Sequence, residues 1–313
     1  MRPARVLVSL AALALLSACG ADRGDSAYDT SVAEPAYEDE HPKLAFDEGH
    51  RELHASDGTY FPLAELARHD GYEVEAVDDA LTEGELAGIR VLVIGCAKGR
   101  NETGDGAAFS PEECAAVERW VDGGGGLLLV TDAFPYGAAA STLAARFGVA
   151  TSNGLTADAI QYDRDGSDDT CLDFSRANRL LGAHPITEGR SEKERLERVV
   201  TFTGQSVRGA EGSVLFLRHG ATAVLREARA RLDKYGEHAQ VIVQYGEEKP
   251  GEGWGQGLAL VHGQGRVVVL GESSVLTALI VQEKKVGMNA RGNDDRQLAL
   301  NVLHWLSGLL PAR

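Results

Sequence analysis

The feature that most constrains this fold is a series of short apolar runs, each followed by residues at helical spacing. Arg90–Gly95 and Leu127–Val130 are almost continuously apolar, as strands buried on both faces are. Between them, the segment SPEE (110–113) has the serine, proline and glutamate of a capped helix start. Strands and helices that alternate in this way predict an α/β protein with an open, mostly parallel sheet flanked by helices.

The remaining elements are expected from the same patterns. Further strands are expected at residues 44–46, 73–77, 199–202, 214–217 and 241–245. Further helices are expected at residues 60–69, 141–147 and 294–310. The glycine-rich turn at 263–265, between the apolar runs 258–262 and 266–270, predicts a β-hairpin in the C-terminal half. We interpret Leu225–Lys234 as a charged surface helix or a long hairpin loop.

Residues 1–18 have the layout of a bacterial signal peptide. Two arginines precede the apolar run Val6–Leu16, which is too short for a helix that crosses a bilayer of about 30 Å. The run ends in LSAC (16–19), which resembles the lipobox of bacterial lipoproteins, where the cysteine thiol carries a diacylglycerol. We therefore expect a lipid anchor on Cys19 that holds the protein in the bacterial cell envelope, facing the periplasm or the cell exterior. An ordinary signal peptide with a chance cysteine is the alternative.

Residues 19–42 are polar and acidic, and they show neither a helical nor a strand period. This composition is typical of a disordered, solvated tether between an anchor and a folded domain. An acidic binding tail is the alternative interpretation. Residues 43–313 are predicted to form a single domain.

The charge balance excludes one class of partner. The 31 Lys and Arg residues are outnumbered by 47 Asp and Glu residues, and no basic stripe compensates for the formal charge of −16, so we expect no nucleic-acid binding. Besides Cys19, the chain has Cys96, Cys114 and Cys171, which allow at most one internal disulfide and lack a zinc-binding spacing. We expect neither a cofactor nor a metal centre.

Six strings, in order along the chain, carry a resemblance to a known fold. They are FDEGH (46–50), GGGGLLLVTD (123–132), HPITEGR (184–190), TFTGQS (201–206), GQGRVVVLGESS (263–274) and GNDDRQLALNVLHWLSG (292–308). Together they resemble the class I glutamine amidotransferase-like fold, and more narrowly a bacterial branch of it with no established activity. The resemblance extends from about Lys43 to Leu310.

The resemblance implies a reaction for which this chain lacks the groups. Amidotransferases of this class attack glutamine with a cysteine at a sharp strand-to-helix turn and use a histidine base. Asp132 occupies the corresponding turn, and GESS (271–274) stands where the histidine is expected. Cys96 follows the strand at 90–95 without the flanking glycines of such a turn, so we interpret it as a buried cysteine in the counterpart of the oxyanion loop. A nucleophilic Cys96 is the alternative.

Three carboxylates form the candidate site, because Asp47, Asp132 and Glu272 stand at the ends of predicted parallel strands. Ligands of open α/β sheets bind at the carboxyl edge, so these residues and His50 are candidates for a polar ligand or a divalent cation. The alternative is that they cap helices and bind backbone amides. A helix at 48–56 would place His50 and His54 on one face.

Ser273 has half of a serine-nucleophile turn, because Gly271 precedes it by two residues, but Val275 replaces the second glycine. The only later histidine, His304, lies on the last predicted helix. We therefore favour a role for Ser273 or Ser274 in capping the helix that follows.

These observations predict a lipid-anchored envelope protein whose amidotransferase-like domain does not catalyse a reaction. It would bind an envelope protein or a polar small molecule, and Cys19 would attach it to the membrane. The alternative is a hydrolase that acts on an envelope glycan or peptide through acidic residues or Ser273.

Overall fold

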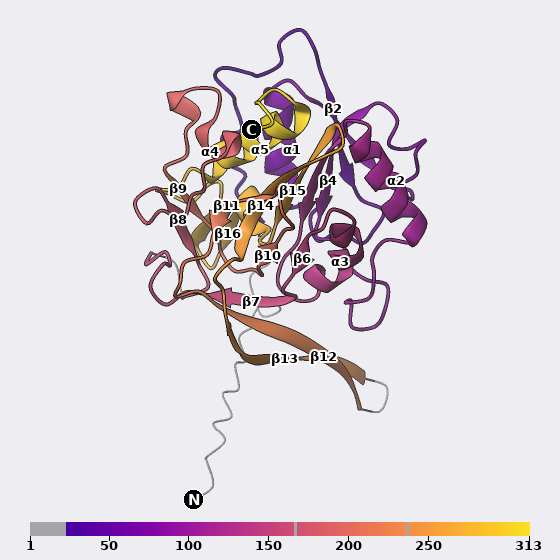
Figure 1. Cartoon of the computed structure of the whole chain (residues 1–313), viewed down its shortest axis with the longest axis vertical. Helices are drawn as coiled ribbons and strands as arrows, with labels where there is room; N and C mark the ends of the chain where they lie inside the picture. Colours follow the sequence, from indigo (N-terminus) through magenta and orange to yellow (C-terminus); the bar gives the residue numbers. More distant parts are fainter. Residues whose placement is uncertain (1–22, 166–167, 236–237) are drawn as a thin grey trace, which may run out of the picture.

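The computed structural model describes residues 23–165, 168–235 and 238–313, so the expected signal peptide and Cys19 lie outside the described residues. A mixed sheet runs through the body of the molecule with helices on both faces, and a two-stranded ribbon extends from one end (Figure 1). The expected fold class, an open sheet flanked by helices, is confirmed. Within the described residues, no helix is long and apolar enough to cross a membrane.

The parallel part of the sheet has the strand order β3-β2-β4-β5-β15. The bounds of these strands are Glu73–Val77 (β3), Lys43–Asp47 (β2), Ile89–Gly95 (β4), Gly126–Val130 (β5) and Gly265–Leu270 (β15). β4 and β5 lie in the middle and are almost entirely buried, which explains their continuous apolar sequence. The strands expected here differ from the observed ones by no more than one residue at each end.

Antiparallel strands extend the sheet beyond β15. They are β14 (Gly255–His262), β10 (Val207–Arg208), β6 (Ala150–Thr151) and β11 (Val214–Arg218), which pairs with β14. The expected hairpin of β14 and β15 is confirmed. Its turn requires Gly263, which has a φ of 56° and lies so close to Asp122 that a Cβ atom would clash with it. A separate pair is formed by β8 (Asp173–Ser175) and β9 (Arg198–Val200).

The helices cover the sheet from both sides. They are α1 (Phe61–His69), α2 (Pro111–Asp122), α3 (Tyr136–Arg146), α4 (Pro185–Glu188) and α5 (Asp295–Ser307), with 3₁₀ turns at Glu192–Glu194 and Ser274–Leu276. Apolar residues of α1 and α5 share one core with one face of the sheet, and those of α2 and α3 share a second core. The expected capping box of α2 is present. α3 begins at Tyr136, five residues before the expected Ser141, with Pro135 as its N-cap residue.

The expected surface helix or loop at 225–234 is wrong. This segment belongs to β12 (Val224–Tyr235), which pairs with β13 (His238–Pro250) to form the projecting ribbon, and its base pairs with β7 (Gly154–Ala157). In the string ARARLD (228–233), apolar and charged residues alternate with a period of two. The charge of the segment suggested a helix, but its alternation is that of a strand, and pairing with β13 confirms the strand.

The expected disordered tether is also wrong for residues 23–42. β1 (Arg23–Gly24) pairs with β16 (Ala278–Val281), which pairs with β17 (Lys284–Gly287). Tyr28, Val32 and Tyr37 then pack against the core of α1 and α5. These apolar residues are not regularly spaced in the sequence, so only the tertiary structure shows that they pack on the core of the domain.

Candidate functional site

The three carboxylates of the candidate site all lie at the carboxyl edge of the sheet, but they belong to two hydrogen-bonded groups. Asp47 ends β2 and belongs to the first group, with His50, Glu52 and Glu113 (the His50 cluster). The second group, the Asp132 cluster, consists of Asp132, Glu272, Ser273 and Cys96.

The His50 imidazole lies between two carboxylates. Its Nδ1 donates to the Asp47 carboxylate at 2.9 and 3.0 Å, and its Nε2 donates to Oε1 of Glu113 at 2.8 Å. Asp47 and His50 are buried, and Glu113 is 8% exposed. Glu52 accepts a hydrogen bond from the backbone N–H of His50. Because both ring nitrogens donate, His50 occupies this site as an imidazolium.

The charges in this cluster determine its pKa values. Burial alone lowers the pKa of His50, but the hydrogen bonds and charges of Asp47 and Glu113 outweigh it and raise that pKa to about 9. Burial and the neighbouring Asp47 raise the pKa of Glu52 to about 9. Burial opposes ionisation of Glu113, yet its hydrogen bonds to Ser110 and His50 lower its pKa. A buried cation thus balances two buried anions.

The cluster has one feature of a metal site. One potential ligand atom each of Asp47, His50 and Glu52 lies within 4.8 Å of the others. Both His50 nitrogens are already hydrogen-bonded to carboxylates, however, and a metal ligand must offer a free ring nitrogen. The donor set therefore fits an internal ion pair better than a divalent cation.

The expected helix at 48–56 is absent, so His50 and His54 do not share a helical face. Arg51 has a φ of 58°, and the loop bonds its backbone to the segment after β4, through Leu53 N–H to Cys96 and Lys98 N–H to His50. His54 stacks on Tyr60 with ring centroids 4.4 Å apart. Tertiary hydrogen bonds replace those of a helix here, which the histidine spacing does not reveal.

The Asp132 cluster binds backbone amides. Asp132 Oδ2 accepts hydrogen bonds from the N–H and the hydroxyl of Ser273, at 3.0 and 2.5 Å. The Glu272 carboxylate accepts the N–H groups of Ser274 and Val275, at 2.7 and 2.9 Å. Glu272 thus caps the short helical turn that follows β15, whereas we expected Ser273 or Ser274 to do so. The glutamate side chain is long enough to reach forward to these two N–H groups, and the Ser273 hydroxyl donates to Asp132 instead.

Among the described residues, no cationic side chain forms an ion pair with the carboxylates of this second cluster. Burial raises the pKa of Asp132 to about 6, although the hydrogen bonds from Ser273 and Ala133 favour its charged form. Burial and the nearby Asp132 raise the pKa of Glu272 to about 8. Part of this cluster is therefore protonated at neutral pH.

Cys96 lies at a sharp bend after β4, with a φ of 64°. Asp132, which we expected at such a bend, has no left-handed backbone conformation. The Cys96 side chain is 1% exposed, and burial together with Asp132 raises the pKa of its thiol. Within the described residues, its thiol forms no hydrogen bond with an imidazole. The bend thus has the backbone strain of a nucleophile turn, but its thiol is closed to solvent.

The sequence interpretation missed a serine–histidine pair. Ser206, the last residue of TFTGQS, has its hydroxyl 2.7 Å from Nε2 of His219 and 2.7 Å from the Thr156 hydroxyl. Ser206 is fully buried and His219 is 9% exposed. Burial lowers the pKa of His219 to about 4 despite the nearby Asp158, which leaves a weak base. Nothing in the spacing of these residues signals the pair, because they meet only in the fold.

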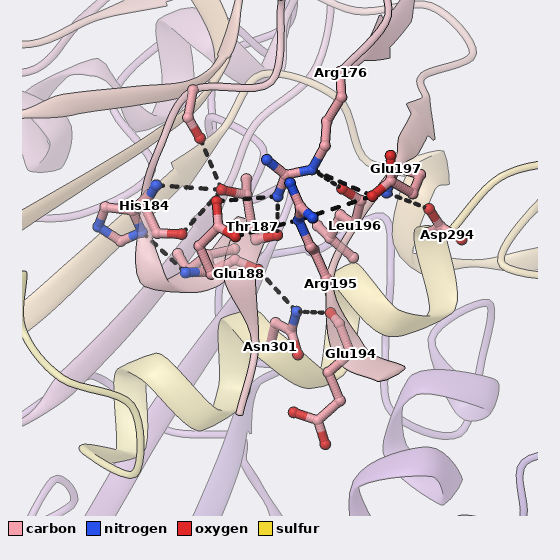
Figure 2. Close-up of polar contacts among 12 residues, drawn as sticks. Arg176, His184, Thr187, Glu188, Glu194, Arg195, Leu196, Glu197, Asp294 and Asn301 are labelled. Carbon is pink, nitrogen blue, oxygen red and sulfur yellow. Dashed lines mark hydrogen bonds and ion pairs between the residues drawn. The ribbon is translucent and has the colours of Figure 1, made fainter. Parts of the chain in front are cut away.

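Another string of the resemblance, HPITEGR, has a structural role (Figure 2). The His184 imidazole accepts the N–H of Ile186 and caps α4, while the Thr187 hydroxyl accepts the N–H of His184. Asn301 of α5 donates to the carbonyl groups of Ile186 and Glu194. These contacts attach α4 and the following turn to α5.

Two cavities lie away from both clusters. One, of about 570 Å³, is lined by residues such as Phe147, His184 and Trp305. The other, of about 690 Å³, lies around Arg198 and Asp163. Neither is lined by the expected site residues Asp47, His50, Asp132, Glu272 and Ser273. Both cavities are therefore separate from the predicted site.

Comparisons with known proteins show similarity of fold. No protein-family model and no curated protein matches the chain. The N-terminal domain of mmIFT52 is 13% identical, with a TM-score of 0.58 over 84% of this chain and 97% of that chain. A ThuA-like protein from Parabacteroides merdae is 13% identical (TM-score 0.43; 86% and 91% covered), and a cytoplasmic protein from Salmonella typhimurium is 14% identical (TM-score 0.44; 85% and 98% covered). At these identities, the IFT52 domain shows that the fold is shared, and no family is assigned.

Proposed function

We propose that this chain is a lipid-anchored protein of the bacterial cell envelope whose amidotransferase-like domain binds a partner and does not catalyse a reaction. Acylated Cys19 would attach it to the membrane, facing the periplasm or the cell exterior. One observation carries the non-catalytic part of the proposal: the reactive groups at the carboxyl edge are engaged by neighbouring residues and closed to solvent.

The nucleophilic and basic side chains at this edge are all buried and hydrogen-bonded or uncharged. Cys96 is buried and its thiol pKa is raised, which keeps it from forming a thiolate. Ser273 donates its hydroxyl to Asp132 and is 2% exposed. His50 is held between two carboxylates and has no free nitrogen. A substrate would have to displace several buried hydrogen bonds before reaching any of these atoms.

The projecting ribbon of β12 and β13 is the surface that best suits a protein partner (Figure 1). Beyond its base on β7, no described helix or strand packs extensively on it. One face carries the cross-strand pairs Leu232–Val241 and Ala230–Val243, and Val241 is 37% exposed. β13 is also the outer strand of its sheet among the described residues. A partner that adds an extended segment to β13 would cover both the edge and this apolar face.

Photo-crosslinking in intact cells tests the proposal. A benzophenone amino acid at Leu232 is expected to form a discrete protein adduct, and the same probe at Gln264, in the turn between β14 and β15, is not. Val241→Glu should abolish the adduct because it places a charge on the apolar face. Gln240→Glu, an adjacent exposed residue on the opposite face, is the matched control and should preserve it.

Two results would contradict this proposal. Adducts of equal yield at residues 232 and 264 would mean that the ribbon has no specific partner. Recovery of the Cys19→Ala variant in the membrane fraction, in the same amount as the unmodified sequence, would refute the lipid anchor.

Hydrolysis of an envelope glycan or peptide is the second candidate, and the Ser206–His219 pair is the observation that favours it. A fluorophosphonate probe tests it directly. Labelling of the folded protein that is lost in Ser206→Ala, but kept in Ser273→Ala, would establish a serine hydrolase. We expect no labelling, since Ser206 is fully buried.

A further inference from the structure

The first described residues of the chain are attached firmly to the fold. The N–H of Asp25 donates to the carbonyl of Ala278 at 2.8 Å. The Asp25 carboxylate binds Asn289 at 3.0 Å and Lys285 at 2.7 Å, and it is 8% exposed. Burial raises the pKa of this carboxyl, but the hydrogen bonds from Lys285 and Asn289 are the larger effect and lower it, so Asp25 is ionised at neutral pH. β1 is therefore held firmly to the folded domain.

Only a short length of chain separates this attachment from the expected lipid. Cys19 precedes Arg23 by four positions. A fully extended chain spans about 3.3–3.6 Å per residue, so Cys19 lies within about 14 Å of the start of β1. An acyl chain on Cys19 that is inserted in a bilayer thus keeps β1 close to the headgroups.

The strand register tells which side of the domain is held there. Arg23 pairs with Ile280, and Gly24 pairs with Leu279, in an antiparallel arrangement. Going backward along β1 therefore means going forward along β16, toward Val281 and the turn at Gln282 and Glu283. The chain thus enters β1 from the side of the β16–β17 turn.

The exposed residues of that turn suit a lipid surface. Gln282 and Glu283 both have left-handed φ values, 47° and 67°, as in the tight turns of hairpins. Lys284 follows and is exposed, and the side chain of Lys285, which also binds Asp25, is 50% exposed, in a protein that is otherwise strongly acidic. Lysine side chains interact favourably with phosphate-bearing headgroups, which repel an acidic surface.

We propose that the β16–β17 turn, residues 282–285, is the face of the domain that lies against the lipid headgroups. This inference rests on the proposed function, because it requires the acylated Cys19. The proposal assigns a fixed orientation to the domain, with the β16–β17 turn facing the membrane. The β14–β15 turn at Gly263 and Gln264 lies at the start of β15, whereas the chain continues from the end of β15 toward β16. We therefore expect the β14–β15 turn to face away from the membrane.

Fluorescence quenching on vesicles tests the orientation. The full-length acylated protein is reconstituted in vesicles of phosphatidylcholine and phosphatidylglycerol that contain a headgroup-located quencher. A fluorophore is attached at Glu283→Cys or, as the matched control in another exposed turn, at Gln264→Cys. Cys96, Cys114 and Cys171 are buried, and the unmodified sequence provides the labelling background. We expect at least threefold stronger quenching at position 283.

A linker variant sharpens the test. Insertion of about 20 Gly and Ser residues between Ala21 and Asp22 raises the root-mean-square reach by roughly 25 Å. Quenching at position 283 should then fall toward the level at position 264, while the protein stays on the vesicles. Equal quenching at both positions without the insertion would overturn the orientation, as would quenching at 283 that the insertion does not reduce.

The two proposals fail in different ways. If the protein with Cys19 and the Cys19→Ala variant are both recovered in the soluble fraction to the same extent, the lipid anchor itself is refuted. If the protein is anchored but both labels are quenched alike, the anchor stands and only the orientation is refuted.

Discussion

The two clusters at the carboxyl edge are built from the same residue types and behave in opposite ways. In the His50 cluster, Asp47 and Glu113 share a buried imidazolium, and the pKa of Glu113 is lowered. In the Asp132 cluster, Asp132 and Glu272 form no ion pair with any cationic side chain that the structure describes, and burial raises their pKa values to about 6 and about 8. At neutral pH, Glu113 of the first cluster is ionised beside His50 while Glu52 keeps its proton, and Glu272 of the second cluster is largely protonated.

The difference shows that position at the edge of a sheet does not define a site. The carboxyl groups of both clusters lose hydration when they are buried. In the His50 cluster an internal counter-ion compensates for this loss. In the Asp132 cluster, hydrogen bonds from backbone amides and a retained proton compensate for it. Neither leaves a charged group free for a ligand. Removing one member should therefore affect stability before it affects any function.

The largest effect is expected at His50. His50→Ala leaves Asp47 and Glu113 as buried carboxylates without a counter-ion, which costs about 3–5 kcal/mol of the free energy of unfolding. Urea denaturation followed by circular dichroism measures the change. His69→Ala, at an exposed histidine of α1, is the control and should change stability by less than about 0.5 kcal/mol. A loss below about 1 kcal/mol at His50 would show that no charged pair is buried there.

A smaller loss is expected at Asp132. Asp132→Ala removes the acceptor for the N–H and hydroxyl of Ser273, which costs about 1–3 kcal/mol for buried donors left without partners. Asp132→Asn keeps one carbonyl acceptor for these two donors and should therefore lose less. If Asn proves as harmful as Ala, the charge of Asp132 matters more than its hydrogen bonds, and the contrast with His50 disappears.

The pH dependence of stability separates the clusters further. The pKa of His50 rises from 6.5 to about 9 on folding, so its contribution is complete below pH 6.5 and is lost as pH rises through 9. The pKa of Asp132 rises from 3.8 to about 6 on folding. Its contribution to the free energy of unfolding therefore decreases as the pH rises from 3.8 to about 6. Urea denaturation midpoints are measured from pH 4 to pH 9. The midpoint should depend less steeply on pH in His50→Gln than in the unmodified protein between pH 6.5 and 9. In Asp132→Asn it should depend less steeply on pH between pH 4 and 6. Identical slopes in the variants and the unmodified protein would refute the assignment.

The smallest effect on stability is expected at the ribbon. Val241→Glu replaces a partly exposed residue outside both cores, so the free energy of unfolding should change by no more than about 0.5 kcal/mol. The same variant should remove the crosslinked adduct at Leu232. A large loss of stability would mean that this face packs within the protein and is not a surface for a partner.

The parallel sheet could be predicted from the sequence, because buried strands such as β4 and β5 must be apolar throughout and the capped helix between them has a local signature. Asp47 and His50 were also found, since both stand next to a strand end. Glu113 was recognised as the acid of a capping box, and it also binds His50. That second contact joins residues 63 positions apart, and local patterns carry no information about it.

The sequence by itself determined the alternation of strands and helices, the acidic surface and the lipobox-like start, because these depend on composition and short-range spacing. Only the tertiary structure decided which acids keep a proton, that residues 23–42 pack on the domain, and that residues 224–235 and 238–250 pair as a ribbon. Those outcomes depend on long-range contacts: a carboxylate's pKa follows from what surrounds it after folding, and a strand forms where another strand can pair with it.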